Sequence, residues 1–161
     1  MALNICYALL LISLFIIIFQ DIKYRAIHIT LPLVVLMLSV AVNYFDATLE
    51  FSDILFNVLF VVVNVGGLFI YFSVKEKRFF NPVDTMLGTG DILFFMAITP
   101  LFGLKAFIFF FIIGLIFSLL THLTINIFKK VETIPLAGYL AIFLGVNVVA
   151  KTVFKFNIPI I

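Results

Sequence analysis

The sequence predicts an all-α fold, a polytopic membrane protein with about six transmembrane helices. The first observation is composition: 65% of the 161 residues are hydrophobic and only 11% are charged. A soluble domain is nearer half apolar and a quarter charged, so this chain has more apolar surface than its own core can bury. The second observation is that the apolar residues form runs about as long as a bilayer is thick. We therefore expect a single transmembrane domain over residues 1–161, covered by the lipid bilayer.

Six apolar runs are the expected helices, because a spanning helix needs about 20 mostly apolar residues. They cover approximately Leu3–Gln20, Ile29–Phe45, Ile54–Val74, Met86–Phe102, Leu104–Phe128 and Ile134–Ala150. The run Ile92–Phe128 would be about 55 Å long as one helix. That exceeds the apolar thickness of a bilayer, so a turn is expected near Pro100–Lys105. The first run follows no Lys or Arg and precedes no small-residue cleavage site, which favours a retained helix over a signal peptide.

Charge and cysteine content exclude several classes of function. The net charge is only +2, and no basic run is longer than Lys129-Lys130, so no nucleic acid partner is expected. The single cysteine, Cys6, can form neither an internal disulfide nor a cysteine metal cluster. His28 and His122 have no partner at ligand spacing, and we expect no metal or other cofactor.

The distribution of Lys and Arg predicts the orientation in the membrane. The loops after the first, third and fifth helices hold seven of these residues: Lys23, Arg25, Lys75, Lys77, Arg78, Lys129 and Lys130. The opposite side holds three: Lys105, Lys151 and Lys155. We expect a protein of the inner (plasma) membrane. Because cytoplasmic loops are enriched in Lys and Arg, the loops after the first, third and fifth helices should be cytoplasmic and the N-terminus should lie outside.

Two acids, Asp21 and Asp91, are the candidate catalytic residues. Both are expected at the cytoplasmic membrane face, and Asp91 would lie about 7 Å into a helix that begins near Met86. A carboxylate at that depth is costly unless it is paired or faces a wet cavity. Two adjacent carboxyl groups share a proton, so one can activate water while the other polarises a peptide carbonyl. The alternatives are a polar helix end for Asp21 and a structural hydrogen bond for Asp91.

Two glycines precede the second acid in Gly88-Thr89-Gly90-Asp91. Gly88 and Gly90 allow tight turns and close backbone approach, and they equally suit close helix packing. Asp84 is a third acid nearby. We interpret it as a residue of a helical first turn, because Asn81-Pro82 is typical of a helix start.

These motifs together resemble those of the GxGD membrane aspartyl proteases, and within them the type IV prepilin and archaeal preflagellin peptidases. The family's first motif is an Asp followed by basic residues and Ile-Pro, and here it is Asp21-Ile22-Lys23-Tyr24-Arg25-Ala26-Ile27-His28. The GxGD motif is Gly88 to Asp91, and Ile134-Pro135-Leu136-Ala137-Gly138 resembles a later Pro-Phe-Gly-Pro-like segment. The order, spacing and expected helix count agree along most of the chain.

The chain departs from the family pattern at three positions. His28 stands where Pro is usual, Leu93 where many members have Lys, and Gly138 lacks a following Pro. Members that also N-methylate their product carry an extra N-terminal region, often with paired CxxC motifs. This chain starts at its first helix and has one Cys, so the resemblance implies a minimal peptidase without methylation.

The resemblance implies an aspartic endopeptidase that cleaves the leader of a prepilin-like membrane precursor at the cytoplasmic membrane face. Asp21 and Asp91 would be catalytic, with Gly88 and Gly90 as the active-site motif. Lys23 and Arg25 would contact substrate or lipid.

Two other functions stay open at the level of sequence. The first is a catalytically silent membrane subunit of a pilus or secretion assembly, which the departures at His28 and Leu93 favour. The second is a small ion transporter, since acids within membranes also mark ion paths. The position of both acids at the membrane edge disfavours the transporter.

Overall fold

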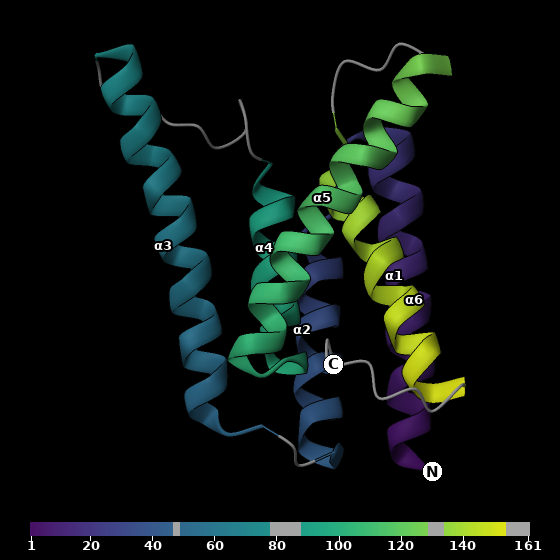
Figure 1. The fold of residues 1–161 in the computed structure, drawn as a ribbon. Coiled ribbons are helices and arrows are strands. Elements are labelled where there is room, and N and C mark those ends of the chain that lie inside the picture. Colours follow the sequence, from purple (N-terminus) through teal and green to yellow (C-terminus); the bar gives the residue numbers. More distant parts are fainter. Residues whose placement is uncertain (47–48, 78–87, 129–133, 154–161) are drawn as a thin grey trace.

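The computed structural model describes residues 1–46, 49–77, 88–128 and 134–153. Within these ranges the chain forms six α-helices and one 3-10 helix, and no strand (Figure 1). The elements are α1 (Ala2–Tyr24), α2 (Thr30–Asp46), α3 (Phe51–Glu76), α4 (Thr89–Ile98), η1 (Thr99–Leu101), α5 (Leu104–Phe128) and α6 (Leu136–Val153). The all-α prediction is therefore confirmed.

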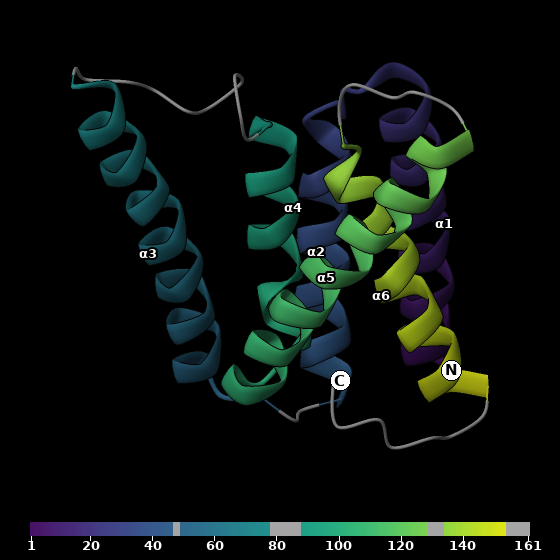
Figure 2. The same ribbon diagram turned by 45° about the horizontal axis from the view of Figure 1, so that its top comes forward.

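Five of the helices gather into one bundle, and α3 leans away from it toward the end where α3 finishes (Figures 1 and 2). Within the bundle, α1 packs against α2 and α6, α2 packs against α4, and α5 packs against α6. The core between them is apolar, with fully buried Leu10, Leu14, Phe94, Phe110 and Leu140 at its centre. The bundle thus brings α1, α4 and α6, which are distant in sequence, next to one another.

Many large apolar side chains point outward, as expected of a chain embedded in lipid. Phe15 on α1, Met37 on α2 and Ile70 on α3 are all more than two-thirds exposed. In the described part of the chain, α1, α3 and α5 are long and apolar enough to cross a membrane. Helices α2 and α6 and the segment Thr89–Leu101 are apolar but shorter. A membrane-embedded protein follows from this, while crossing by the three shorter helices stays a prediction.

The fourth helix begins later than the sequence pattern suggests. Gly88 has an extended backbone (φ −66°, ψ 139°) and is the N-cap of α4, which starts at Thr89. Glycine suits an N-cap better than a helix interior, where its backbone freedom is costly. The predicted position of Asp91, about 7 Å into the helix, is therefore wrong, because Asp91 lies in the first turn. Met86 itself lies outside the described residues, as do Asn81, Pro82 and Asp84.

The first helix ends later than expected, at Tyr24 instead of Gln20. Arg25 takes a left-handed conformation (φ 55°, ψ 27°) that stops the helix, and its N–H donates to the Asp21 carbonyl oxygen at 3.0 Å. This extension places Asp21 and Lys23 in the last turn of α1, and Arg25 directly after it.

The basic residues in the described ranges separate between the two ends of the bundle. Lys23 and Arg25 end α1, and Lys75 and Lys77 end α3, at the end away from the N-terminus (Figure 1). At the other end, Lys151 forms an ion pair with Asp46 at 3.1 Å, which ties α6 to α2. Arg78, Lys129, Lys130 and Lys155 lie outside the described residues.

One buried amide attaches α3 to the bundle. Asn57 is fully buried, and its Nδ2 donates to the carbonyl oxygens of Thr99 at 3.1 Å and Phe102 at 2.6 Å. Thr99 is the first residue of η1, and Phe102 directly follows η1, so the helix has no N–H group left for the Phe102 carbonyl. Phe60, one turn along α3, packs edge-on against Phe111 with ring centroids 5.2 Å apart.

Replacing this amide is expected to weaken the attachment of α3. Asn57→Leu removes two hydrogen bonds and leaves the buried Phe102 carbonyl unpaired, which costs about 1–3 kcal/mol. The midpoint of thermal unfolding in detergent should fall clearly. Asn64→Leu is the matched control, since the Asn64 amide donates to the Phe60 carbonyl of its own helix. Equal midpoints for the two variants would contradict this role of Asn57.

Candidate active site

The two candidate acids lie at the same end of the bundle. Asp21 is in the last turn of α1 and Asp91 is in the first turn of α4, at the end away from the N-terminus (Figure 1). Asp21 is 6% exposed, and Asp91 is half-buried. The expectation that these acids share one end of the molecule therefore agrees with the structure.

Both carboxylates bind the first turn of α6. The N–H of Gly138 donates to Asp21 Oδ2 at 2.6 Å, and the N–H of Ala137 donates to Asp91 Oδ1 at 2.9 Å. Consecutive residues have Cα atoms about 3.8 Å apart, so carboxylates on consecutive amides are close neighbours. Two acids 70 positions apart in the sequence are thereby brought to one point.

The start of α6 explains why these two amides are available. The first N–H groups of any helix have no partner within it. Here the N–H of Leu136 donates to the Ile134 carbonyl at 3.0 Å, and that of Tyr139 donates to the Pro135 carbonyl at 3.1 Å. Ala137 and Gly138 lie between them and take the two carboxylates as acceptors. The positive end of a helix dipole also favours negative groups at this position.

A pocket of about 210 Å³ contains both acids. Its lining comes from the end of α1, the segment after it and the start of α4: Asp21, Arg25, Ala26, Ile27, Gly88, Thr89, Gly90 and Asp91. A water molecule takes about 30 Å³ of the liquid, so this pocket can hold several. The two carboxylates therefore face a common space that water and a peptide group can enter.

Three glycines around the acids allow close packing of the backbone. A Cβ on Gly138 would lie 3.1 Å from Asp21 Oδ2, and a Cβ on Gly88 would lie 3.1 Å from Asp91 Oδ2. A Cβ on Gly90 would lie 3.3 Å from the Cβ of Ile27. None of the glycines, all of which lie in the described ranges, has a positive φ. Gly88 thus packs closely against Asp91, and Gly90 packs closely against Ile27.

The two basic residues beside the first acid lie in different places. Arg25 is exposed and lines the pocket. The Nζ of Lys23 instead lies 5.1 Å from the ring centroid of Phe19 and 5.0 Å from that of Tyr24. Arg25 can therefore meet a group bound in the pocket, whereas Lys23 is placed to anchor the end of α1.

The family departures at His28 and Leu93 lie outside the pocket lining. The His28 Nδ1 is 2.8 Å from Thr30 Oγ1, and the His28 N–H donates to Gln20 Oε1 at 3.0 Å. These contacts stabilise the connection between α1 and α2. Among the described residues, no group of three His, Cys, Asp or Glu side chains could hold a metal ion.

Sequence reasoning missed the backbone groups that assemble this site. In the sequence, Ala137 and Gly138 stand out only as part of a segment that resembles a family motif. Residue type does not indicate which backbone N–H groups will bind a carboxylate. Pro135 directly before α6 is the available signal, since proline favours a helix start. A glycine in the following turn could then indicate close contact with another group.

The sequence matches the type IV leader peptidase family over residues 8–149. The match includes both acids, the pocket between them and the first turn of α6. No curated protein and no solved structure matches the chain at a significant level. Because the family match covers most of the chain, this protein belongs to the type IV leader peptidase family.

Proposed function

We propose that the protein is an aspartic endopeptidase that removes the leader of a prepilin-like membrane precursor. The observation that carries this proposal is the binding of Asp21 and Asp91 to consecutive amides of α6 beside a shared pocket. Family membership supports leader peptidase activity in general, and the paired carboxylates supply its chemistry. Gly88 and Gly90 act as the active-site motif: Gly88 keeps the backbone close to Asp91, and Gly90 keeps the start of α4 close to Ile27.

The dyad acts with one carboxyl group protonated and the other ionised, because two adjacent carboxylates do not both ionise readily. The ionised group accepts a proton from water, and the water oxygen bonds to the peptide carbonyl carbon. The protonated group donates a hydrogen bond to the carbonyl oxygen and stabilises the negative charge that develops there. Transfer of a proton to the amine nitrogen then breaks the C–N bond and releases the leader.

The reaction takes place at the cytoplasmic face of the inner membrane, with the N-terminus of the chain outside. The Lys and Arg bias supports this orientation, since Lys23, Arg25, Lys75 and Lys77 end α1 and α3 at the same end as the dyad. The precursor carries a short basic leader followed by an apolar helix. Arg25 in the pocket contacts the polar backbone near the cleavage site, and Lys23 contacts lipid headgroups.

Replacing either acid by its amide is expected to abolish cleavage without unfolding the protein. Asp21→Asn and Asp91→Asn keep an oxygen that can accept the α6 hydrogen bond but cannot exchange a proton. Cleavage should fall by at least about 10²–10⁴-fold, the usual contribution of a general acid or base. The assay is co-expression with a pilin-like precursor, with leader removal followed on a gel.

Asp53→Asn serves as the matched control, because Asp53 lies in the first turn of α3 at the far end from the dyad. This variant should cleave like the wild type. Complete leader removal by Asp21→Asn or Asp91→Asn would contradict the proposal.

A side chain at Gly138 is expected to reduce activity indirectly. In Gly138→Val the new Cβ would lie 3.1 Å from Asp21 Oδ2 and 3.3 Å from Asp21 Cβ, so the carboxylate must move. A displacement near 1 Å can cost about 10²-fold in rate. Gly66→Val is the control, since nothing lies within 4 Å of a Cβ there. Equal cleavage rates for the two variants would show that the geometry at Gly138 does not matter.

A further inference from the structure

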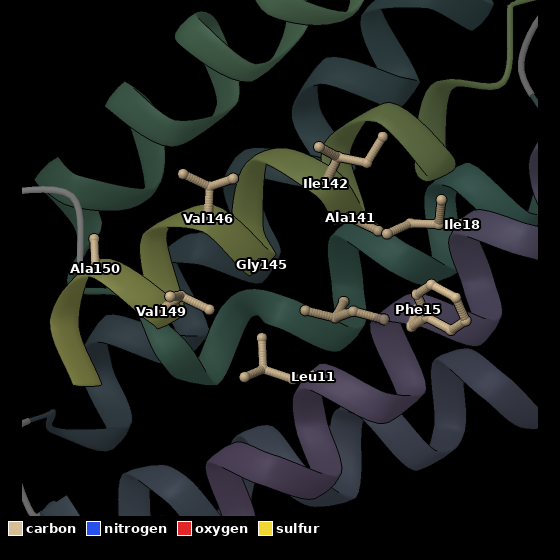
Figure 3. Close-up of a pocket in the computed structure, with 10 residues that line it drawn as sticks. Leu11, Phe15, Ile18, Ala141, Ile142, Gly145, Val146, Val149 and Ala150 are labelled. Atoms are coloured by element: carbon tan, nitrogen blue, oxygen red, sulfur yellow. The ribbon is translucent and has the colours of Figure 1, made fainter. Parts of the chain in front are cut away.

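A second cavity lies along the outer face of the bundle, between α1 and α6 (Figure 3). Its volume is about 420 Å³. All of its lining side chains are apolar: Leu11, Leu14, Phe15 and Ile18 on α1, and Ala141, Ile142, Gly145, Val146, Val149 and Ala150 on α6. We call this feature the α1–α6 groove.

The groove has a closed floor and an open rim. Leu14 and Ala141 on its floor are buried, whereas Phe15 is 69% and Val146 is 63% exposed. Ala141 and Gly145 are one helical turn apart on α6, and a Cβ at Gly145 would be 3.9 Å from the nearest atom of Leu11. In membranes, small residues at this spacing let another helix approach closely.

The groove leads directly to the dyad. Ile18 is three residues before Asp21 on α1, and Ala141 is three residues after Gly138 on α6. Residues three apart lie on the same face of a helix, so each wall of the groove continues into one of these two residues. Asp21 and Gly138 are joined by the 2.6 Å hydrogen bond that closes this end. The apolar groove and the polar pocket therefore meet at Asp21.

We propose that the α1–α6 groove binds the apolar helix of the membrane precursor, immediately beside the peptide bond that is cut. This inference rests on the proposed peptidase function and adds the location of the substrate helix. The groove from Ala141 to Ala150 is about 14 Å long, or about two and a half turns of a facing helix. Its end at Asp21 places the first turn of that helix next to the dyad.

The two cavities suit different parts of the precursor: the apolar groove suits its helix, and the polar pocket suits the peptide bond that is cut. A helix satisfies its own backbone groups, so it can lie in a groove that has no polar lining. The bond to be cut must instead be exposed, and its unpaired N–H and C=O groups need polar partners. The pocket with Asp21, Arg25 and Asp91 offers such groups. The precursor would therefore keep its apolar segment helical in the groove, and the leader junction that contains the cleaved bond would be unwound in the pocket.

Filling the groove tests the proposal through substrate binding. Gly145→Leu places a bulky side chain on its floor, and the KM for a pilin-like precursor should rise about tenfold, as expected for overpacking of a close contact. Cleavage of a short peptide that spans the leader junction but lacks the helix should not change. Gly67→Leu is the matched control, because Gly67 is an exposed helical glycine on α3 with nothing within 4 Å of its Cβ.

A second measurement needs no catalysis, so failure of the groove and failure of the dyad can be told apart. A photo-crosslinking amino acid replaces Val149 on the groove or Ile70 on α3, in the Asp91→Asn background. The probe is the isolated apolar helix of the precursor in lipid vesicles. Crosslinking from position 149 but not from position 70 supports the groove, even if no variant cleaves. Crosslinks to lipid alone, or an unchanged KM in Gly145→Leu alongside normal cleavage, would overturn it.

Discussion

The first turn of α6 holds together the end of the bundle that carries Asp21 and Asp91. Its two N–H groups at Ala137 and Gly138 need acceptors, and the buried carboxylates of Asp91 and Asp21 need donors. The amides donate to the carboxylates, and the bonded residues are 46 positions apart for Ala137 and Asp91 and 117 positions apart for Gly138 and Asp21. A buried carboxylate without such donors would be expensive, especially near a bilayer. The same two contacts therefore stabilise the junction of α1, α4 and α6 and set the two acids side by side.

This junction also explains why polar and apolar cavities meet at one residue. Asp21 accepts a hydrogen bond from Gly138 and lines the polar pocket. The apolar residues one turn earlier on α1 and one turn later on α6 line the α1–α6 groove. The function that we propose requires both environments next to each other. Packing of α1 on α6 places them side by side.

The sequence was sufficient to predict the helical class and the common end of the molecule at which the two candidate acids lie. Charge is rare in such an apolar chain, so Asp21 and Asp91 stood out by residue type. The amide donors could not be predicted, since every residue except proline carries an N–H group. The start of α4 was misplaced because hydropathy does not record the extended backbone of Gly88. The attachment of α3 to the bundle includes the buried hydrogen bonds of Asn57, and the apolar pattern around that residue gives no sign of them.

The most direct measurement of this account is oxidative crosslinking between positions 21 and 138. A Cβ built on Gly138 lies 3.3 Å from the Cβ of Asp21, close to the separation of about 3.5–4.5 Å found in disulfides. In a Cys6→Ser background, Asp21→Cys with Gly138→Cys should form an intramolecular disulfide in native membranes. Asp21→Cys with Gly145→Cys, two turns further along α6, should not. Absence of the first crosslink, or equal yields for the two pairs, would contradict assembly of the site on the first turn of α6.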